Sequence, residues 1–319
     1  MRFSAFGIPV ALALLVAAAL PPDGSEALAK AGSKSIGTWP AVAKRMRAAA
    51  LAQAKADYEL ALARAYTEAS AEAQDAAREE ARGEYADARD TVKAQYAARL
   101  DLAGLLQEEA PYSVAINPAD FVSGVTNPYN PLTPGTTLVY ETQTADGLER
   151  NEVETTSSTK VILGVTCIEV HDQVWLDDVL IEDTLDWFAQ DATGNVWYFG
   201  EESKQFTDGR LVGIEGSWQS GVDNAQPGII MKAAPAIDDA YRQEFLLGVA
   251  EDYGRVESLA ATASVPAGEY STCVKTFDGS ALEPDAREHK TYASGVGVVL
   301  EEDDETGDRT ELVEVRTGP

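Results

Sequence analysis

The sequence predicts an α+β protein with segregated elements, in which a long helical segment precedes an antiparallel β half-barrel, barrel or sandwich. Residues 39–106 are dominated by Ala, Glu, Arg, Gln and Lys, which favour helices, and no proline follows Pro40 in this stretch. From about residue 135 the pattern changes to short runs of alternating apolar and polar residues. Turn residues separate these runs at intervals of about 8–12 residues, which is typical of an antiparallel barrel or sandwich.

Residues 1–29 have the pattern of a signal peptide. Arg2 precedes an apolar run at residues 6–20 that is shorter than a bilayer span, and residues 27–29 (ALA) have the small-x-small form that signal peptidases accept. We therefore expect cleavage before Lys30 and export to the periplasm or the exterior. An uncleaved membrane anchor is the lesser alternative, and we expect no membrane span after cleavage.

The net charge of −28 lies almost wholly in the second part of the chain, because residues 30–108 contain equal numbers of basic and acidic residues. An acidic surface repels phosphate backbones and anionic lipid head groups. We therefore expect no nucleic-acid partner.

The helical segment, residues 30–108, carries a narrow apolar stripe. Tyr58, Leu62 and Tyr66 recur four residues apart, whereas the stripe between Glu68 and Glu84 consists of alanine. This pattern predicts either one long helix or a hairpin that bends near Gly83. The segment is expected to be a solvated spacer or a surface through which residues 39–108 form a homo-oligomer. A Pro- and Asn-rich linker is predicted at residues 109–134.

The acidic β domain is predicted to span residues 135–319. A bulge is expected at Gly164, a turn at Asp177-Asp178 and an irregular, glycine-punctuated loop at residues 216–245. Besides the central hairpin described next, the predicted strands are Thr136–Gln143, Leu148–Thr156, Val161–Val174, Arg210–Glu215, Arg255–Ala263, Tyr270–Phe277, Lys290–Val299 and Glu311–Val315.

Residues 181–202 are predicted to form a central hairpin whose loop is Asp191–Gly194. The expected register pairs Ala189 with Trp197 and places a core face on one side of the hairpin. That core face carries Leu185, Trp187, Ala189, Trp197 and Phe199. The second face is half aromatic and half polar, so another sheet, a helix or a ligand is expected to cover it. It carries Asp186, Phe188, Gln190, Val196 and Tyr198.

The second face is the predicted site of a non-catalytic binding protein, with the 216–245 loop as its cover. The ligand is expected to be a small apolar molecule or a protein partner. The residues predicted to bind it are Asp186, Phe188, Tyr198, Trp218, Ile229, Met231 and Glu244.

Asp186 is the most specific candidate within this set. A carboxylate among aromatic rings, with space above it at the facing Gly200, would have a perturbed pKa. It would then act as an acid or bind a cation, and paired with Glu244 or Asp252 it would serve a hydrolase or lyase. The alternative is a structural Asp that pairs with a basic side chain, for which the candidates are Arg242, Arg255 and Lys290.

No cofactor is predicted. Carboxylates are dense between Asp172 and Glu202 and could hold Ca²⁺, although they lack EF-hand spacing and are equally explained as solvated acidic turns. Cys167 and Cys273 lie in apolar, strand-like surroundings. They are expected to form one disulfide or to remain two buried thiols, and both alternatives stay open.

Several stretches, taken in order, resemble a family of secreted bacterial proteins of unknown function. They are FVSGVTNPYNPLTPGTTLVYE, DWFAQDATGNVWYFGE, GSWQSGVDNAQPGIIM, YRQEF, AEDYGRV, VPAGEY and KTYASGVGVV. The resemblance covers residues 119–319 and implies an exported all-β domain, but it implies no catalytic residues. The succession of hairpins is also similar to lipoprotein-carrier half-barrels, at the level of fold class alone.

Overall fold

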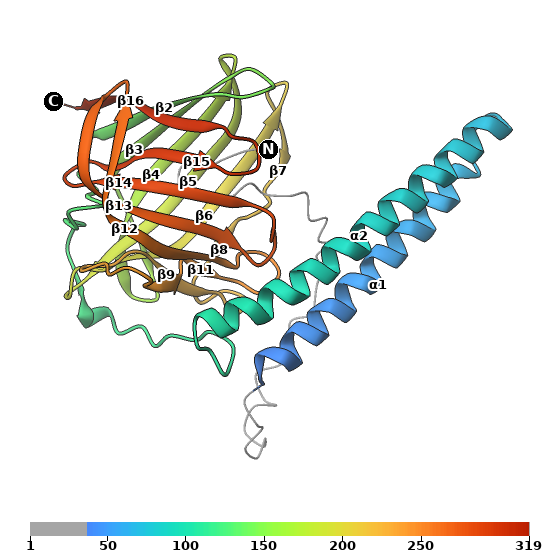
Figure 1. Ribbon diagram of the computed structural model, residues 1–319, viewed down its shortest axis with the longest axis horizontal. Helices are drawn as coiled ribbons and strands as arrows, with labels where there is room; N and C mark the ends of the chain where they lie inside the picture. Colours follow the sequence, from blue (N-terminus) through green and yellow to red (C-terminus); the bar gives the residue numbers. More distant parts are fainter. Residues whose placement is uncertain (1–36, 319) are drawn as a thin grey trace. The chain divides into compact units, whose positions relative to one another are not determined.

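The computed structural model describes residues 37–318, so the predicted signal peptide and its cleavage site lie outside the described residues. Within this range the chain forms two compact units, and the boundary between them falls between Pro111 and Tyr112. The first unit is helical and the second is a β structure (Figure 1). None of the helices in the described range combines the length and the apolar character needed to cross a membrane.

The helical unit is a hairpin of α1 (Trp39–Ala65) and α2 (Ala71–Leu105). The two helices run antiparallel, and Tyr58 stacks on Tyr85 with 4.8 Å between the ring centroids (Figure 1). The prediction of a bend near Gly83 is wrong, because the chain turns at residues 66–70. There Ser70 accepts a hydrogen bond from the amide of Ala73 and caps α2. A cap of this kind stabilises the start of a helix by about 1 kcal/mol, which favours a helix that begins after Ser70. A single glycine such as Gly83 is tolerated within a helix.

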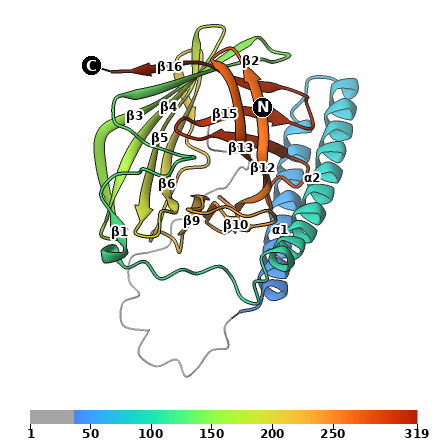
Figure 2. The same cartoon turned by 60° about the vertical axis from the view of Figure 1, so that its left-hand side comes forward.

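The β unit is one large antiparallel sheet that is nearly closed into a barrel, as Figure 2 shows. This confirms the predicted α+β class and selects the barrel among its alternatives. Along the sheet the strands follow the order β10-β12-β13-β14-β15-β16-β2-β3-β4-β5-β6-β9-β11, and three short strands pair at its margins. The bounds are β1 Phe121–Val122, β2 Thr136–Gln143, β3 Leu148–Ile162, β4 Val165–Leu176, β5 Val179–Asp191, β6 Val196–Thr207, β7 Arg210–Gly213, β8 Trp218–Gln219, β9 Gln226–Met231, β10 Ala240–Arg242, β11 Glu244–Phe245, β12 Asp252–Val265, β13 Gly268–Ser280, β14 Arg287–Ala293, β15 Gly297–Asp303 and β16 Arg309–Thr317.

A single stretch of chain joins the two ends of this nearly closed sheet. β10 pairs with β12 and β11 pairs with β9, so the two ends of the sheet meet at Gln243, the residue between β10 and β11. The amide of Gln243 itself donates to the carbonyl of Asp252. Residues 216–245, predicted as a covering loop, thus supply β8 to β11 and form part of the barrel wall.

Two turns divide runs that the sequence presents as single strands. Leu163 and Gly164 both have positive φ, at 50° and 82°, and form a two-residue hairpin turn where a bulge was predicted. A second turn around Gly295 separates β14 from β15 within the predicted strand Lys290–Val299. The turn at Asp177-Asp178 is confirmed, again with positive φ at both positions. Such turns normally carry Gly or Asn, so a leucine at the first position conceals the turn in the sequence.

The sheet packs against two hydrophobic clusters, one on each face. The barrel interior holds the larger cluster, which includes Phe188, Val196 and Tyr198. The outer face of the hairpin β5–β6 holds a smaller cluster that includes Trp187 and Phe199. The prediction that both faces are covered is confirmed. The face predicted as the core is the outer one, and the face predicted as the site lines the barrel interior.

Residues 112–134 belong to the β unit, although the sequence suggests a linker. The hydroxyl group of Tyr112 donates to the carbonyl of Pro227, and Val125 forms a β-bridge with Leu132. A short 3₁₀ helix at Pro118–Asp120 precedes β1, which pairs with β5. This segment therefore packs against the barrel, and it forms one wall of the groove described below.

Candidate functional site

The structure brings the predicted ligand-binding residues together but leaves them no open surface. Their side chains lie in or against the interior cluster of the barrel, where Asp186 and Phe188 are fully buried. Tyr198, Trp218, Met231 and Glu244 are also buried, and Ile229 packs against the cluster. The sequence thus predicted a true spatial group, and this group is packed in the barrel interior.

The aromatic members of this group fill the space between one another. Phe188 stacks on Tyr198 with 4.7 Å between the ring centroids, and Tyr198 meets Trp218 edge-on at 5.3 Å. The hydroxyl group of Tyr198 donates to Oδ1 of Asp186 at 2.5 Å. The rings and the carboxyl group are therefore each other's partners, and a ligand would have to replace these contacts.

The space expected above Asp186 does not exist. A β-bulge in β6 shifts the register, so Phe188 faces Tyr198 while Asp186 faces Glu201 rather than Gly200. At Gly200, a Cβ atom would lie 2.5 Å from the carbonyl oxygen of Trp218. The glycine is required for the close approach of β8, whose backbone takes up the room that the sequence suggested was free.

Four carboxyl groups neighbour one another in a series: Asp186, Glu201 and Glu244 lie near Tyr198, and Asp252 neighbours Glu244. They come from four strands: Asp186 on β5, Glu201 on β6, Glu244 on β11 and Asp252 on β12. Burial raises the pKa of Asp186 to about 7 and that of Asp252 to about 6. Burial, with the neighbouring carboxylates, also holds the pKa of Glu201 and Glu244 well above the usual range. Oδ2 of Asp186 has no hydrogen-bond partner among the described residues, which fits a carboxyl group that keeps its proton up to about pH 7.

A second acidic group surrounds one buried lysine. Nζ of Lys290 lies 3.5 Å from Oδ2 of Asp278 and 3.7 Å from Oε2 of Glu301, and all three side chains are almost fully buried. Burial raises the pKa of Glu301 to about 7 and holds that of Glu288 well above its usual range. Burial lowers the pKa of Lys290, but the surrounding carboxylates outweigh it, so the net shift is upward and the lysine stays charged.

The basic residues considered as partners of Asp186 have other contacts. Lys290 lies between two other carboxylates, and Arg255 pairs with Glu257 at 3.1 Å. The guanidinium group of Arg242 lies over the ring of Phe245 at 4.8 Å. Asp186 accepts a hydrogen bond from the hydroxyl group of Tyr198 rather than pairing with one of these cations.

The acidic run between Asp172 and Glu202 does not gather at one point. Asp172 and Asp186 lie buried in the interior, whereas Asp177 and Asp178 form a hairpin turn. Among residues 37–318 no group of three or more His, Cys, Asp or Glu side chains is arranged to hold a metal ion. The alternation of a β-strand sends successive acids to opposite faces and so separates residues that are close in sequence.

Cys167 and Cys273 are both buried free thiols. Cys167 belongs to the outer cluster and Cys273 to the interior one, so the sheet itself lies between them. Of the two alternatives left open by the sequence, the structure therefore has the buried thiols. Burial raises the pKa of Cys167 to about 12, which keeps this thiol protonated.

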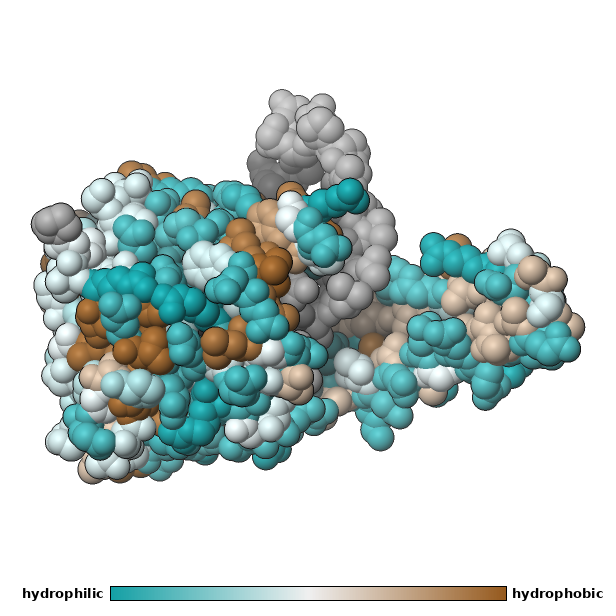
Figure 3. All heavy atoms as spheres, turned by 90° about the horizontal axis from the view of Figure 1, so that it is seen from above, coloured by the Kyte–Doolittle hydropathy of each residue, from teal (hydrophilic) through white to brown (hydrophobic). Residues whose placement is uncertain are grey.

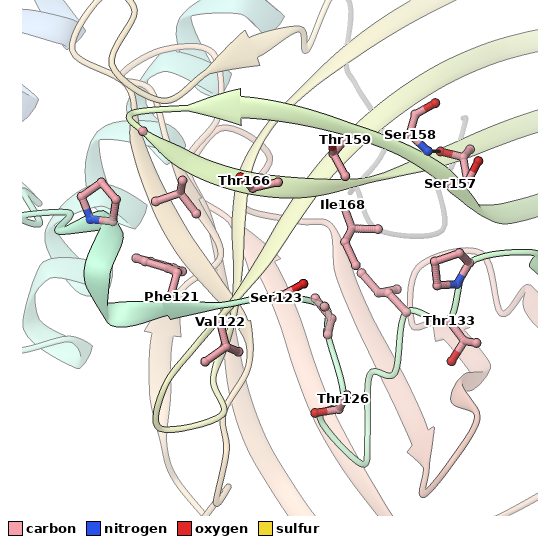
Figure 4. Close-up of a pocket in the computed structure, with 18 residues that line it drawn as sticks. Phe121, Val122, Ser123, Thr126, Thr133, Ser157, Ser158, Thr159, Thr166 and Ile168 are labelled. Carbon is pink, nitrogen blue, oxygen red and sulfur yellow. Dashed lines mark hydrogen bonds between the residues drawn. The ribbon is translucent and has the colours of Figure 1, made fainter.

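An open groove lies between residues 118–134 and the end of the hairpin β3–β4 (Figure 4). Its volume is about 570 Å³, within the range of small-molecule sites. None of its lining residues is charged, although the protein carries a net charge of −28. Hydroxyl groups come from Ser123, Thr126, Thr133, Thr156, Ser157, Ser158, Thr159 and Thr166, and apolar side chains from Phe121, Val122, Val125, Leu132, Val165 and Ile168.

A wide bulge in β3 shapes this groove. Thr155 pairs with Val170 and Thr159 with Ile168, so residues 156–158 face Glu169 alone on β4. Within the bulge the amide of Ser158 donates to the hydroxyl oxygen of Thr156. Bulges redirect side chains and are frequent beside functional sites. The sequence signal is the run TTSST at residues 155–159, where the alternation of the strand breaks, and the predicted strand Leu148–Thr156 ends within this run.

No protein-family model, no curated protein and no solved structure matches the chain. The case for a function therefore rests on the geometry of the molecule.

Proposed function

We propose that this protein is an exported, non-catalytic binding protein that takes an uncharged ligand in the groove between residues 118–134 and the hairpin β3–β4. The observation that carries the proposal is the uncharged lining of an open groove on a strongly acidic protein. This replaces the interior face as the binding site and retains the class of function expected from the sequence. Export rests on the N-terminal pattern and on the resemblance to secreted bacterial proteins.

The lining specifies the chemistry of the ligand. Apolar side chains such as Ile168 and Leu132 favour contact with hydrocarbon surface, and the serine and threonine hydroxyl groups both donate and accept hydrogen bonds. No lining side chain offers an opposite charge to an ionic group, so the hydroxyl groups alone would have to compensate the lost hydration of a charged ligand. The groove therefore suits an uncharged molecule with apolar and hydrogen-bonding parts.

The interior carboxyl groups are less suited to be a site of catalysis. Asp186 has no exposed surface, and Glu244 is 8% exposed. A substrate of a hydrolase or lyase would have to displace Phe188 and Tyr198, whose stacked rings fill the space beside the carboxyl group. The groove needs no such rearrangement, which favours binding over carboxylate catalysis.

A test uses N-phenyl-1-naphthylamine, an uncharged apolar dye that fluoresces when it leaves water. The full chain is expected to enhance its fluorescence, and Thr159→Trp, which fills the groove, is expected to weaken dye binding at least about tenfold. Thr207→Trp is the matched control, because Thr207 is an exposed strand residue that does not line the groove. Equal dye binding by the two variants would refute the proposal.

Native mass spectrometry of the protein purified from an exporting host tests the remaining expectations. Cleavage before Lys30 would support export by a signal peptide. A bound molecule whose mass identifies it as an uncharged compound would support ligand binding in the groove. The rival structural role requires an oligomer through residues 39–108. A monomeric mass under gentle conditions would dismiss that role.

A further inference from the structure

The groove lies beside a stretch of β-strand that has only one strand neighbour. β2 pairs with β3 as far as Thr136 opposite Thr155, and the amide of Gly135 donates to the carbonyl of Thr155. β3 then continues to Ile162, paired only with β4. In the part of the chain that the structure describes, no strand pairs with residues 156–162 on the side that β2 leaves. This stretch of β3 is the free edge.

The hydrogen-bonding groups on the free edge follow from the hairpin that β3 forms with β4. Leu163-Gly164 is a two-residue turn, so Ile162 and Val165 form the hydrogen-bonded pair that flanks it. Bonding to β4 then alternates along β3. The backbone amide and carbonyl groups of Thr159 and Val161 consequently point away from β4, toward the open side.

Two large apolar side chains on and beside the free edge are exposed. Val161 is 66% exposed, and Leu163 in the adjoining turn is 46% exposed. The one charged residue of the stretch, Lys160, holds Nζ 3.2 Å from the centroid of the Trp187 ring. Its charge is therefore held against the outer cluster. Natural proteins normally protect such an edge with charged side chains or bulges. Here Lys160 is the one charge and residues 156–158 form the one bulge, while Val161 lies beyond the bulge with its side chain exposed.

From this arrangement we propose that the free edge of β3 binds an extended segment of another polypeptide by strand addition. The segment lies alongside Thr159–Ile162, and one of its alternate sets of side chains enters the groove. The inference rests on the proposed function and names the class of ligand. Because the lining is uncharged, the segment itself is uncharged where it lies in the groove.

The acidity of the protein decides against a second copy as the partner. Two chains that each carry a net charge of −28 repel one another, whereas a neutral or basic polypeptide is not repelled. Elsewhere on the β unit hydrophobic patches lie among hydrophilic side chains (Figure 3), and Leu211, Val212 and Ile214 are exposed. These residues do not line the groove described above, so that groove gives no form for a partner there.

The test begins with a phage-displayed library of short random peptides selected on the full chain. The affinity of a selected peptide is then measured by fluorescence anisotropy for the wild type, Val161→Pro and Val161→Thr. Proline removes the amide donor that faces the open side, so we expect affinity to fall about tenfold. Threonine keeps the donor and a β-branched shape, so its affinity should stay within about twofold. Urea unfolding of each variant shows whether it remains folded.

A second arm does not depend on changing the protein. The selected peptide is synthesised in two N-methylated forms, each methylated on one of the two alternating sets of residues. Strand addition requires that the form methylated on the β3-facing amides binds at least about tenfold more weakly, while the other form binds normally. Equal binding by both forms would overturn strand addition.

The outcomes separate this inference from the proposed function. If no peptide is selected, or if selected peptides bind Val161→Pro as well as the wild type, strand addition is wrong. The groove remains supported in that case as long as Thr159→Trp still weakens binding of the uncharged dye. If Thr159→Trp does not change dye binding, the groove proposal fails. A loss of peptide affinity in Val161→Pro would then support binding at the free edge without the groove.

Discussion

The barrel interior and the groove beside β3 differ in charge, in aromatic content and in accessibility. The interior has the residue types that the sequence predicts for a site, and the groove does not. The interior holds carboxyl groups, a lysine and stacked aromatic rings, yet these side chains are packed against one another. The groove holds hydroxyl and apolar side chains without any charge, yet it is open. Chemically conspicuous residues are therefore a poor guide to a binding site unless their accessibility is known.

The physical reason for the difference is the cost of burying charge. Carboxyl groups inside the barrel remain compatible with folding because burial raises their pKa or because Lys290 compensates them. Such groups are protonated or are paired with a neighbouring side chain, and they are not free to bind a ligand. The following changes, arranged from the largest expected effect to the smallest, test this comparison.

Replacement of Lys290 by Met is expected to have the largest effect. It leaves the carboxylates of Asp278 and Glu301 without their cation, which should cost about 3–5 kcal/mol of unfolding free energy near pH 8. The loss should be smaller near pH 5, where Glu301 is protonated. Lys275→Met is the control, because its ion pair with Glu302 is half-exposed and worth less than about 1 kcal/mol. Equal losses in urea unfolding would contradict this account of the interior.

The dependence of stability on pH gives the second prediction. Asp186 and Glu301 have pKa values raised to about 7 and Asp252 to about 6, whereas unfolded carboxyl groups titrate near 4. Between about pH 4 and pH 7 the folded protein keeps protons that the unfolded chain has released. The free energy of unfolding is therefore expected to fall as pH rises through this window, by about 1.4 kcal/mol for each unit by which the pKa of a carboxyl group is raised. Urea unfolding across the window measures it, and stability that is flat or rises with pH would refute the raised values.

Two aspartates on β5, Asp186 in the interior and Asp191 at the hairpin loop, allow a buried carboxyl group to be compared with a partly exposed one on the same strand. Asp186→Asn keeps an acceptor for the Tyr198 hydroxyl group and removes the buried ionisation, so it should stabilise the protein by about 1–2 kcal/mol near pH 8 and much less near pH 5. The same exchange at Asp191 should destabilise by about 1 kcal/mol at both pH values.

The difference arises because Asp191 accepts hydrogen bonds as a carboxylate. Its oxygens receive donors from Thr193, Asn195 and the Trp197 indole, and these bonds lower its pKa, although partial burial opposes them. The stability it contributes is thus present above its unfolded pKa and is lost only in stronger acid. If both variants changed stability in the same direction near pH 8, the distinction between buried and loop carboxyl groups would fail.

The smallest effect on stability is expected in the groove. Ser157 is exposed, so Ser157→Lys should change the unfolding free energy by less than about 0.5 kcal/mol. The same change places a charge in an uncharged groove and should abolish binding of the naphthylamine dye. Titration of the dye against folded variant protein measures this, and undiminished binding would show that the groove lining does not select uncharged ligands.

The sequence predicted local elements where a strong local signal was present. The strand Thr136–Gln143 is reproduced to the residue, and the hairpin loop at Asp191–Gly194 forms as expected, with Gly194 at a φ of 100°. The turn at Leu163-Gly164 was missed because its first residue has a conformation that leucine rarely adopts. The bend of the helical hairpin was misplaced because Gly83 is a weaker signal than the cap at Ser70.

The candidate site shows a similar division. Strand alternation correctly placed Asp186, Phe188 and Tyr198 on one face, and that face does meet Trp218 and Glu244. A bulge in β6 then changed the partner of Asp186, and the backbone of β8 filled the space at Gly200. Bulges arise from competition between neighbouring strands, so they leave little trace in a single segment of sequence.

By itself the sequence determined the class of each region: helix-forming composition before residue 108, period-two strands after residue 135 and the acidity of the second part. These properties depend on residues within a turn or two of chain, where propensity and alternation act. Only the tertiary structure decided which face of the β5–β6 hairpin is inside and that residues 240–245 close the barrel. It alone placed an uncharged groove beside the free edge of β3. Accessibility is set by packing between distant segments, and no local pattern contains that information.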